Sequence, residues 1–177
     1  MGKHNTLPIF IVIILLIVGL SGCTSKTTYM VEMRDGIHLT TDVYLPSEDS
    51  LPHGTIFIRT PYNKDGLQRL GITWALYGWP VVIQDMRGRF ASEGVDTAFW
   101  NAHTDGPDSL AWIANQSWCN GRIATFGGSA LGICQYFMAG ANPSNLACQY
   151  IQVATPNLHH HAIFQGCLLY TSPSPRD

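Results

Sequence analysis

The stretch that most constrains the fold of this 177-residue chain is residues 122–132. A short apolar run with β-branched residues ends there in two glycines, a single serine follows, and a helix-like apolar segment, residues 131–139, begins almost at once. A strand that turns so tightly into a helix holds the residue at the turn in a strained backbone conformation, with its side chain clear of the sheet. The sequence therefore predicts a nucleophile elbow with Ser129 at its apex.

Small residues around the serine favour this interpretation. The backbones of the strand and the helix nearly touch at an elbow, so small residues are needed two before the serine and two or three after it. Gly127 and Gly132 meet this need, whereas Leu131 stands where the strict G-x-S-x-G pattern has glycine. A strand that ends in Gly-Gly-Ser also occurs in ordinary turns, so the neighbouring motifs have to decide.

The N-terminus has the composition of a secretory signal. A charged start is followed by an apolar run, residues 9–20, and then by small residues. Because this run is shorter than the roughly 20 residues that cross a bilayer, residues 1–22 are predicted to be a signal peptide. A membrane helix that stays uncleaved is the alternative.

The sequence Leu-Ser-Gly-Cys at residues 20–23 resembles a bacterial lipobox, in which the cysteine is lipidated and becomes the mature N-terminus. Cys23 is therefore the expected lipidation site, and residues 23–28 are expected to form a short polar tether. This interpretation predicts an extracytoplasmic protein that a lipid anchors to the cell membrane.

The C-terminal residues 167–177 have no periodicity and no compositional link to the residues before them. They resemble translated adaptor sequence at the end of a gene fragment, so we expect this tail to be non-native and the gene to continue beyond Gly166. A genuine Pro/Ser-rich tail is the alternative. With Cys23 and Cys167 set aside, the sequence leaves open whether any two of the remaining cysteines form a disulfide. These are Cys119, Cys134 and Cys148.

Charge and length bound the remaining part of the chain. Ten Lys and Arg residues stand against 12 Asp and Glu, so no basic surplus indicates a nucleic-acid partner. Residues 29–166 are enough for one hydrophobic core, and a single domain is expected.

Apolar periodicity over this domain predicts strands that alternate with helices. The first two strands flank Asp35-Gly36 and are expected to form a β-hairpin. The later alternation predicts an α/β fold, with a mostly parallel sheet that has an antiparallel start and helices on both faces. Expected strands are residues 29–34, 38–45, 55–59, 80–84, 123–126 and 148–154, and expected helices are 67–77, 105–116 and 131–140.

Four motifs occur in a fixed order along the domain. They are Arg-Thr-Pro-Tyr-Asn-Lys at residues 59–64, Gln-Asp-Met-Arg-Gly at 84–88 with Ser-Glu-Gly at 92–94, Trp-Ile-Ala-Asn-Gln-Ser-Trp at 112–118, and Gly-Gly-Ser-Ala-Leu-Gly at 127–132. Together they resemble the N-terminal half of the catalytic domain of the Xaa-Pro dipeptidyl-peptidase and cocaine-esterase-like hydrolases. The resemblance runs over about residues 29–166. It implies an α/β-hydrolase fold, a helical cap inserted later in the chain and a C-terminal jelly-roll domain.

The resemblance also implies the site residues. Ser129 is the expected nucleophile, and the backbone N–H of Ala130 and the hydroxyl of Tyr62 are the expected oxyanion donors. A serine hydroxyl needs a histidine base that a carboxylate orients, and in this fold both follow the serine in the chain. Asp177, in the suspect tail, is the one acidic residue after Ser129. The acid and the base are therefore expected beyond this fragment, which alone should be inactive.

The other conspicuous residues have milder interpretations. The three histidines at residues 159–161 follow an expected strand and are interpreted as a loop or helix start near the site, not as a catalytic base or a metal site. Asp85 and Arg87 are expected to brace the loop behind the site. Trp100 and Trp112 are expected to be packing residues.

These observations together predict a lipid-anchored serine hydrolase that cleaves ester or amide bonds through an acyl-enzyme, without a metal or an organic cofactor. The expected substrate is a small ester or amide or a short peptide. The sequence does not separate esters, Xaa-Pro peptides and β-lactam side chains, and it leaves the oligomeric state open. A surface lipoprotein that uses the same fold for binding, without catalysis, is the competing hypothesis.

Overall fold

The structure is a computed structural model that describes residues 24–47, 53–159, 161, 164–165 and 168–169. The predicted signal peptide and the lipidation site at Cys23 lie outside the described residues. Of the expected non-native tail, the backbone of residues 168–169 is described, and the tail's origin stays a prediction.

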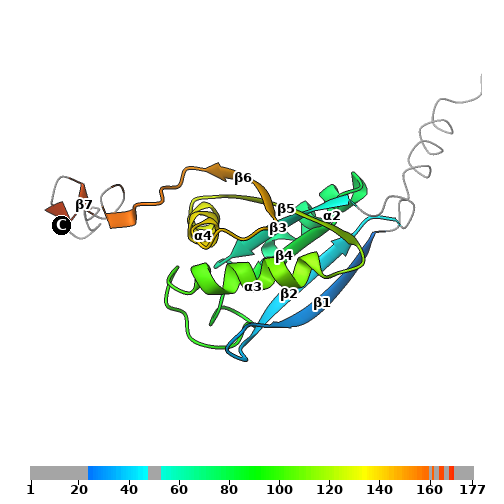
Figure 1. The fold of residues 1–177 in the computed structure, drawn as a ribbon, viewed down its shortest axis with the longest axis horizontal. Helices are drawn as coiled ribbons and strands as arrows, with labels where there is room; N and C mark the ends of the chain where they lie inside the picture. The colour runs from blue at the N-terminus through cyan, green and yellow to red at the C-terminus, as the bar shows by residue number, and fades with distance from the viewer. Residues whose placement is uncertain (1–23, 48–52, 160, 162–163, 166–167, 170–177) are drawn as a thin grey trace, which may run out of the picture.

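A six-stranded sheet forms the centre of the domain, with strand order β1-β2-β4-β3-β5-β6 (Figure 1). β1 pairs antiparallel with β2, and β2 pairs antiparallel with β4, while β3, β4, β5 and β6 pair in parallel. The prediction of a mostly parallel sheet with an antiparallel start is confirmed. The strands are β1 (Ser25–Glu32), β2 (His38–Leu45), β3 (His53–Thr60), β4 (Val81–Asp85), β5 (Cys119–Gly128) and β6 (Leu146–Gln152).

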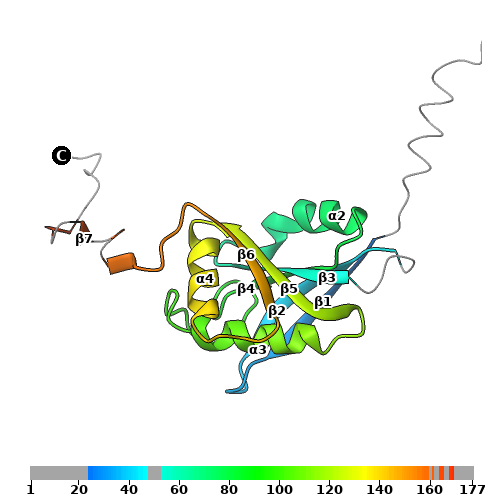
Figure 2. The same cartoon turned by 45° about the horizontal axis from the view of Figure 1, so that its top comes forward.

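Helices cover the sheet on both faces, α2 on one face and α3 and α4 on the other (Figure 2). Successive residues of a strand point to opposite faces, which gives each layer its own core. Phe57 packs in the cluster that holds Leu110 of α3 and Met138 of α4, whereas Ile58 packs with Ala75 of α2. The helical segments are η2 (Lys64–Leu67), α2 (Gln68–Leu76), α3 (Ala102–Ala114) and α4 (Ala130–Ala139).

The structure corrects the expectation of a tether at residues 23–28. Residues 25–28 form the first half of β1. Their backbone pairs with β2, from Ser25 opposite Leu45 to Thr28 opposite Asp42. The side chains are polar, but two of them bind the buried Asp42 carboxylate: Lys26 Nζ lies 2.8 Å from it and Thr28 Oγ1 2.7 Å. A polar edge strand carries no apolar periodicity, so the sequence pattern did not reveal it.

The two tryptophans differ in their environment. Trp112 contacts Trp118 and Tyr29 at ring-centroid distances of 6.4 and 5.3 Å, as expected for a packing residue. Trp100 is 73% exposed, so the expectation that it is a packing residue is wrong. It precedes α3, which begins at Ala102, earlier than predicted.

The three remaining cysteines, Cys119, Cys134 and Cys148, are all free. No disulfide therefore links them, which answers the question that the sequence left open.

Beyond the main sheet, β7 (Phe164–Gln165) and β8 (Leu168–Leu169) form a short antiparallel pair. In the part of the chain that the structure describes, no helix is both long enough and apolar enough to cross a membrane.

Candidate active site

Ser129 stands between β5 and α4 with backbone angles of φ 52° and ψ −124°. A positive φ is uncommon for a residue with a side chain, and such strain costs on the order of 1–3 kcal/mol. The surrounding backbone holds this conformation: Ser129 N donates to the Gln152 carbonyl of β6 at 2.9 Å, and the Ser129 carbonyl accepts from Ile133 N at 2.9 Å. The side chain is exposed. The predicted elbow geometry is confirmed.

Glycines make the close approach at the elbow possible. A Cβ added to Gly127 would lie 2.3 Å from the Leu131 Cβ, and one added to Gly132 would lie 2.7 Å from the Ala154 Cβ. The structure thus explains why leucine is tolerated at position 131. Gly127 leaves space for its side chain, while Gly132 is the residue that lets α4 approach β6.

Gly127→Ala is therefore expected to destabilise the protein by about 1–3 kcal/mol, the usual cost of overpacking, and to displace the serine. Gly66→Ala is the matched control, because nothing lies within 4 Å of a Cβ at Gly66. Urea unfolding of the two variants, followed by tryptophan fluorescence, measures the difference. Equal midpoints for both variants would show that the elbow accepts a Cβ at position 127.

The two expected oxyanion donors lie near the same edge of the sheet. Ala130 is buried and is the first residue of α4, so its N–H has no acceptor within the helix. β3 and β5 are parallel, with Phe57 opposite Thr125, and continuing that register puts Thr60 beside Gly128. The loop that carries Tyr62 therefore starts next to the elbow. Tyr62 itself is 63% exposed, and its role as a donor stays a prediction.

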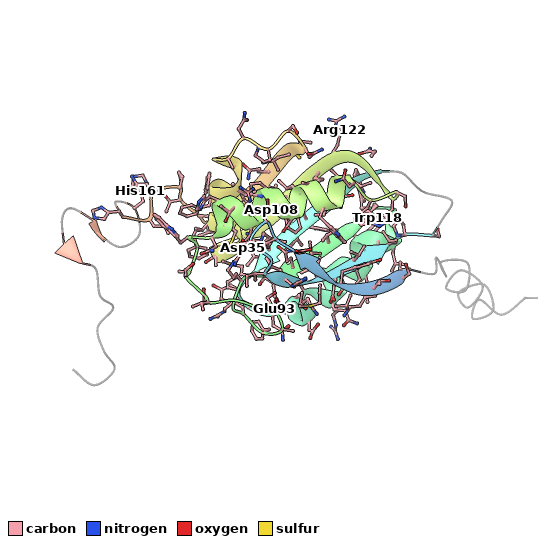
Figure 3. The ribbon with its side chains drawn as sticks, turned by 60° about the horizontal axis from the view of Figure 1, so that its bottom comes forward. Asp35, Glu93, Asp108, Trp118, Arg122 and His161 are labelled. Atoms are coloured by element: carbon pink, nitrogen blue, oxygen red, sulfur yellow. The ribbon has the colours of Figure 1, made fainter. Side chains whose placement is uncertain are left out.

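A cavity of about 460 Å³ opens beside the serine. Trp118 directly precedes β5, and Figure 3 shows His161 at the opposite end of the domain. His161 Nδ1 lies 3.0 Å from Thr155 Oγ1, and no Asp or Glu is among the described residues around this cavity. The expected position of the histidines near the site is thus confirmed for His161. The lining residues are Ser129, Ile133, Val153, Ala154, Thr155, Leu158 and His161.

Asp85, the last residue of β4, and Arg87, just after it, hold the segment behind the site, as expected. Arg87 Nη2 lies 2.6 Å from the buried Asp105 carboxylate of α3, and its Nη1 lies 2.7 Å from Asp35 in the hairpin turn. Hydrogen bonds to these two carboxylates hold the pKa of Arg87 above its ordinary value. Asp85 is 1% exposed, and burial raises its pKa to about 6.

Sequence reasoning missed two residues that support the loop around Tyr62, namely Lys64 and Arg89. Lys64 is 8% exposed, and its buried ammonium is paired with the Asp42 carboxylate at 3.2 Å. Arg89 Nε donates to the Pro61 carbonyl at 3.0 Å. Both residues lie inside or next to the motifs at residues 59–64 and 84–88, which was the available signal.

Two further groups do not belong to the site. Burial raises the pKa of the Cys134 thiol to about 11, which makes it a poor nucleophile.

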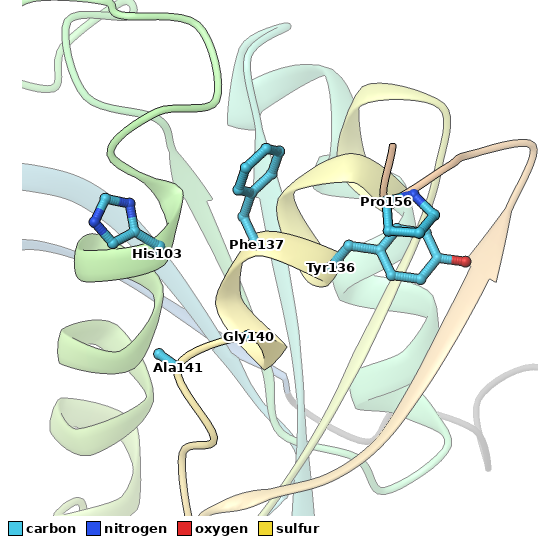
Figure 4. Close-up of a pocket in the computed structure, with 6 residues that line it drawn as sticks. All are labelled: His103, Tyr136, Phe137, Gly140, Ala141 and Pro156. Carbon is cyan, nitrogen blue, oxygen red and sulfur yellow. The ribbon is translucent and has the colours of Figure 1, made fainter. Parts of the chain in front are cut away.

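A second cavity, of about 320 Å³, lies between α3, α4 and the segment after β6. Its lining includes His103 and Tyr136, but the tyrosine hydroxyl points away from the histidine ring (Figure 4). Within the described residues, no group of three or more His, Cys, Asp or Glu side chains could hold a metal ion.

A parallel sheet in which one strand turns through a strained serine directly into a helix defines the α/β-hydrolase fold. Solved structures support this class. An α-amino acid ester hydrolase superposes with a TM-score of 0.65 at 25% identity, over 73% of this chain and 25% of that chain. A CocE/NonD family hydrolase from Staphylococcus aureus gives a TM-score of 0.61 at 28% identity, over 71% of this chain and 26% of that chain.

The chain belongs to the X-Pro dipeptidyl-peptidase (S15) family, whose match covers residues 35–172. The cocaine esterase of Rhodococcus sp. (strain MB1 Bresler) is 36% identical over 136 residues, which are 73% of this chain and 24% of that protein. The chain therefore spans about a quarter of the length of these relatives. The family resemblance drawn from the four motifs is confirmed.

Proposed function

We propose that this chain is the N-terminal part of a serine hydrolase that cleaves ester or amide bonds through an acyl-enzyme. The observation that supports it most is the backbone of Ser129, held at φ 52° on an exposed turn beside a cavity of about 460 Å³. A strained, exposed serine at the carboxyl edge of a parallel sheet is the arrangement that presents a hydroxyl to a substrate carbonyl. The esterase names of the relatives point to the same chemistry.

In the proposed reaction, Ser129 Oγ attacks the carbonyl carbon of the substrate while a histidine base takes the hydroxyl proton. The carbonyl oxygen becomes an oxyanion, which the Ala130 N–H and the Tyr62 hydroxyl stabilise. The bond to the leaving alcohol or amine then breaks, and the leaving group receives the proton. Water attacks the acyl-enzyme in the second half of the reaction, which releases the acid and restores the serine.

The test is to recover the complete reading frame and to express both the full-length protein and these 177 residues. A fluorophosphonate probe should label Ser129 of the full-length protein, because the downstream acid and base activate it. The shorter chain should stay unlabelled. A full-length protein with no Asp and His in the positions of the acid and the base, and with no labelling, would instead favour the surface lipoprotein that only binds.

We further propose that Cys23 carries a lipid that anchors the protein outside the cytoplasm. The proposal rests on the sequence at residues 20–23. In a bacterial host the precursor should incorporate labelled fatty acid and sediment with membranes, and Cys23→Ala should abolish both. Cys148→Ala, which removes an exposed cysteine of β6, is the control and should label normally. Equal labelling of the Cys23→Ala variant would contradict the anchor.

A further inference from the structure

Two loops at the carboxyl edge of the sheet are tied together behind the elbow. One follows β3 and carries Tyr62, and the other follows β4. Met86 N donates to the Thr60 carbonyl at 3.0 Å, and Arg89 Nε donates to the Pro61 carbonyl at 3.0 Å. The third and shortest bond runs from Lys64 N to the Asp85 carboxylate, at 2.7 Å. The last residue of β4 and the segment after it thus fix the Tyr62 loop at both of its ends.

Lys64 is the far anchor of this loop, and it is held through its backbone and its side chain. Besides the amide bond to Asp85, its ammonium lies 3.2 Å from Asp42 and 3.1 Å from Asp65. Burial acts to lower the pKa of Lys64, but the hydrogen bonds to these two carboxylates outweigh it and keep the pKa above its ordinary value. Lys64 therefore stays charged and paired with both carboxylates.

Between the anchors, few contacts hold Tyr62 itself, although the Asn63 side chain and carbonyl accept from Asp65 N and Gly66 N. Tyr62 is 63% exposed, so packing contributes little to its position. Its backbone N–H donates to Thr60 Oγ1 at 3.0 Å, and Asn63 then turns the chain with a φ of 81°. The direction of the Tyr62 side chain consequently depends on where the backbone enters and leaves residues 61–63. Asp85 fixes the point where it leaves.

The carboxylate of Asp85 is an expensive way to hold a loop. The residue is 1% exposed, and removing a carboxylate from water costs free energy unless its partners compensate. What the carboxylate supplies in return is a short, directional bond to a single amide hydrogen, one that an apolar residue of the same size lacks.

We propose that Asp85 is a positioning residue of the oxyanion site, which fixes the Tyr62 hydroxyl by accepting the Lys64 amide hydrogen. This proposal rests on the proposed function, because it gives Tyr62 a donor's role. A donor that stabilises an oxyanion must be placed within a fraction of an ångström, so a loosened loop costs turnover even when the protein is fully folded.

A double-mutant cycle in the full-length enzyme tests it, with turnover counted per active site titrated by a fluorophosphonate. Asp85→Ala should lower kcat about 10- to 100-fold with KM nearly unchanged, since a displacement near 1 Å can cost that much. In the Tyr62→Phe background the same change should cost less than about 3-fold, because the donor that it misplaces is already gone. Asp85→Asn keeps an acceptor oxygen and should restore most of the turnover.

Ser92→Ala is the matched control. Its hydroxyl donates to the Asp85 carbonyl at 2.9 Å and accepts from Thr40 N at 2.9 Å, so the change weakens the same segment without touching the Tyr62 loop. It should lower the melting temperature and leave kcat per active site intact. Should Asp85→Ala not fold, Asp85→Ser takes its place, because a shorter hydroxyl side chain does not reach the Lys64 amide.

Each outcome decides between the two proposals. An equal loss in both backgrounds, or unchanged kcat with a lowered melting temperature, would overturn the role of Asp85 alone. Wild-type turnover in Tyr62→Phe would overturn the oxyanion role of Tyr62, and the positioning role of Asp85 with it. Unlabelled full-length enzyme would instead overturn the proposed hydrolase function.

Discussion

Ser129→Ala in the full-length enzyme is expected to lower kcat by about 10⁶-fold, the loss typical of removing the nucleophile of a serine hydrolase. The elbow holds one hydroxyl at the mouth of the cavity, and alanine leaves no atom there that can form the acyl bond. Folding should change little, because the side chain is exposed and the strained backbone is fixed by its neighbours. Replacing a positive-φ serine with alanine costs no packing.

The measurement is steady-state turnover of a small aryl ester, together with fluorophosphonate labelling. Ser144→Ala is the control, since Ser144 is exposed and its hydroxyl contacts its neighbour Asn145. The control should keep both turnover and labelling. Residual turnover of Ser129→Ala within about 10-fold of wild type would require another nucleophile, and the assignment of Ser129 would be wrong.

Tyr62→Phe is expected to lower kcat by about 10²–10³-fold, or roughly 3–4 kcal/mol of transition-state stabilisation, with KM nearly unchanged. The variant keeps the ring and removes only the hydroxyl. The loss should appear in kcat because the hydrogen bond strengthens only as the oxyanion forms. The parallel register of β3 and β5 places the start of this loop beside the elbow, which is compatible with this role.

Because Tyr62 is exposed, this test separates a loss of turnover from a loss of stability. With 63% of the residue exposed, losing the hydroxyl should leave the melting temperature within about 1 °C of wild type. Tyr77→Phe is the control, because Tyr77 is 77% exposed and follows α2. A Tyr62→Phe enzyme that melts early but keeps wild-type kcat would show a structural tyrosine and remove it from the oxyanion site.

Much of the fold could be predicted because its signals are local. Apolar periodicity located the strands and helices of the main domain, and the alternation of strand with helix predicted the parallel sheet. The ends of elements were less accurate. β5 begins at Cys119, before its predicted start. The pattern missed its first residues because exposed polar side chains interrupt them and leave no continuous apolar run.

The candidate site was predicted in part for the same reason. A strand, two glycines, a serine and a helix are consecutive in the chain, so the elbow at Ser129 could be found without knowing any long-range contact. The loop with Tyr62 could be assigned to the same edge because it follows a parallel strand. The bonds that hold this loop could not be predicted. Asp85 and Lys64 are 21 positions apart and meet only because β4 lies beside β3.

The sequence by itself therefore determined most of the strands and helices of the main domain, where the sharp turn lies and which family the chain belongs to. Those properties depend on residues that are neighbours in the chain. The tertiary structure alone decided that residues 25–28 extend β1, that Trp100 is exposed, that His161 lines the cavity of Ser129 and that Asp85 holds the Lys64 amide. These properties depend on how segments far apart in the chain come to lie side by side, and the pattern within any one segment does not fix that.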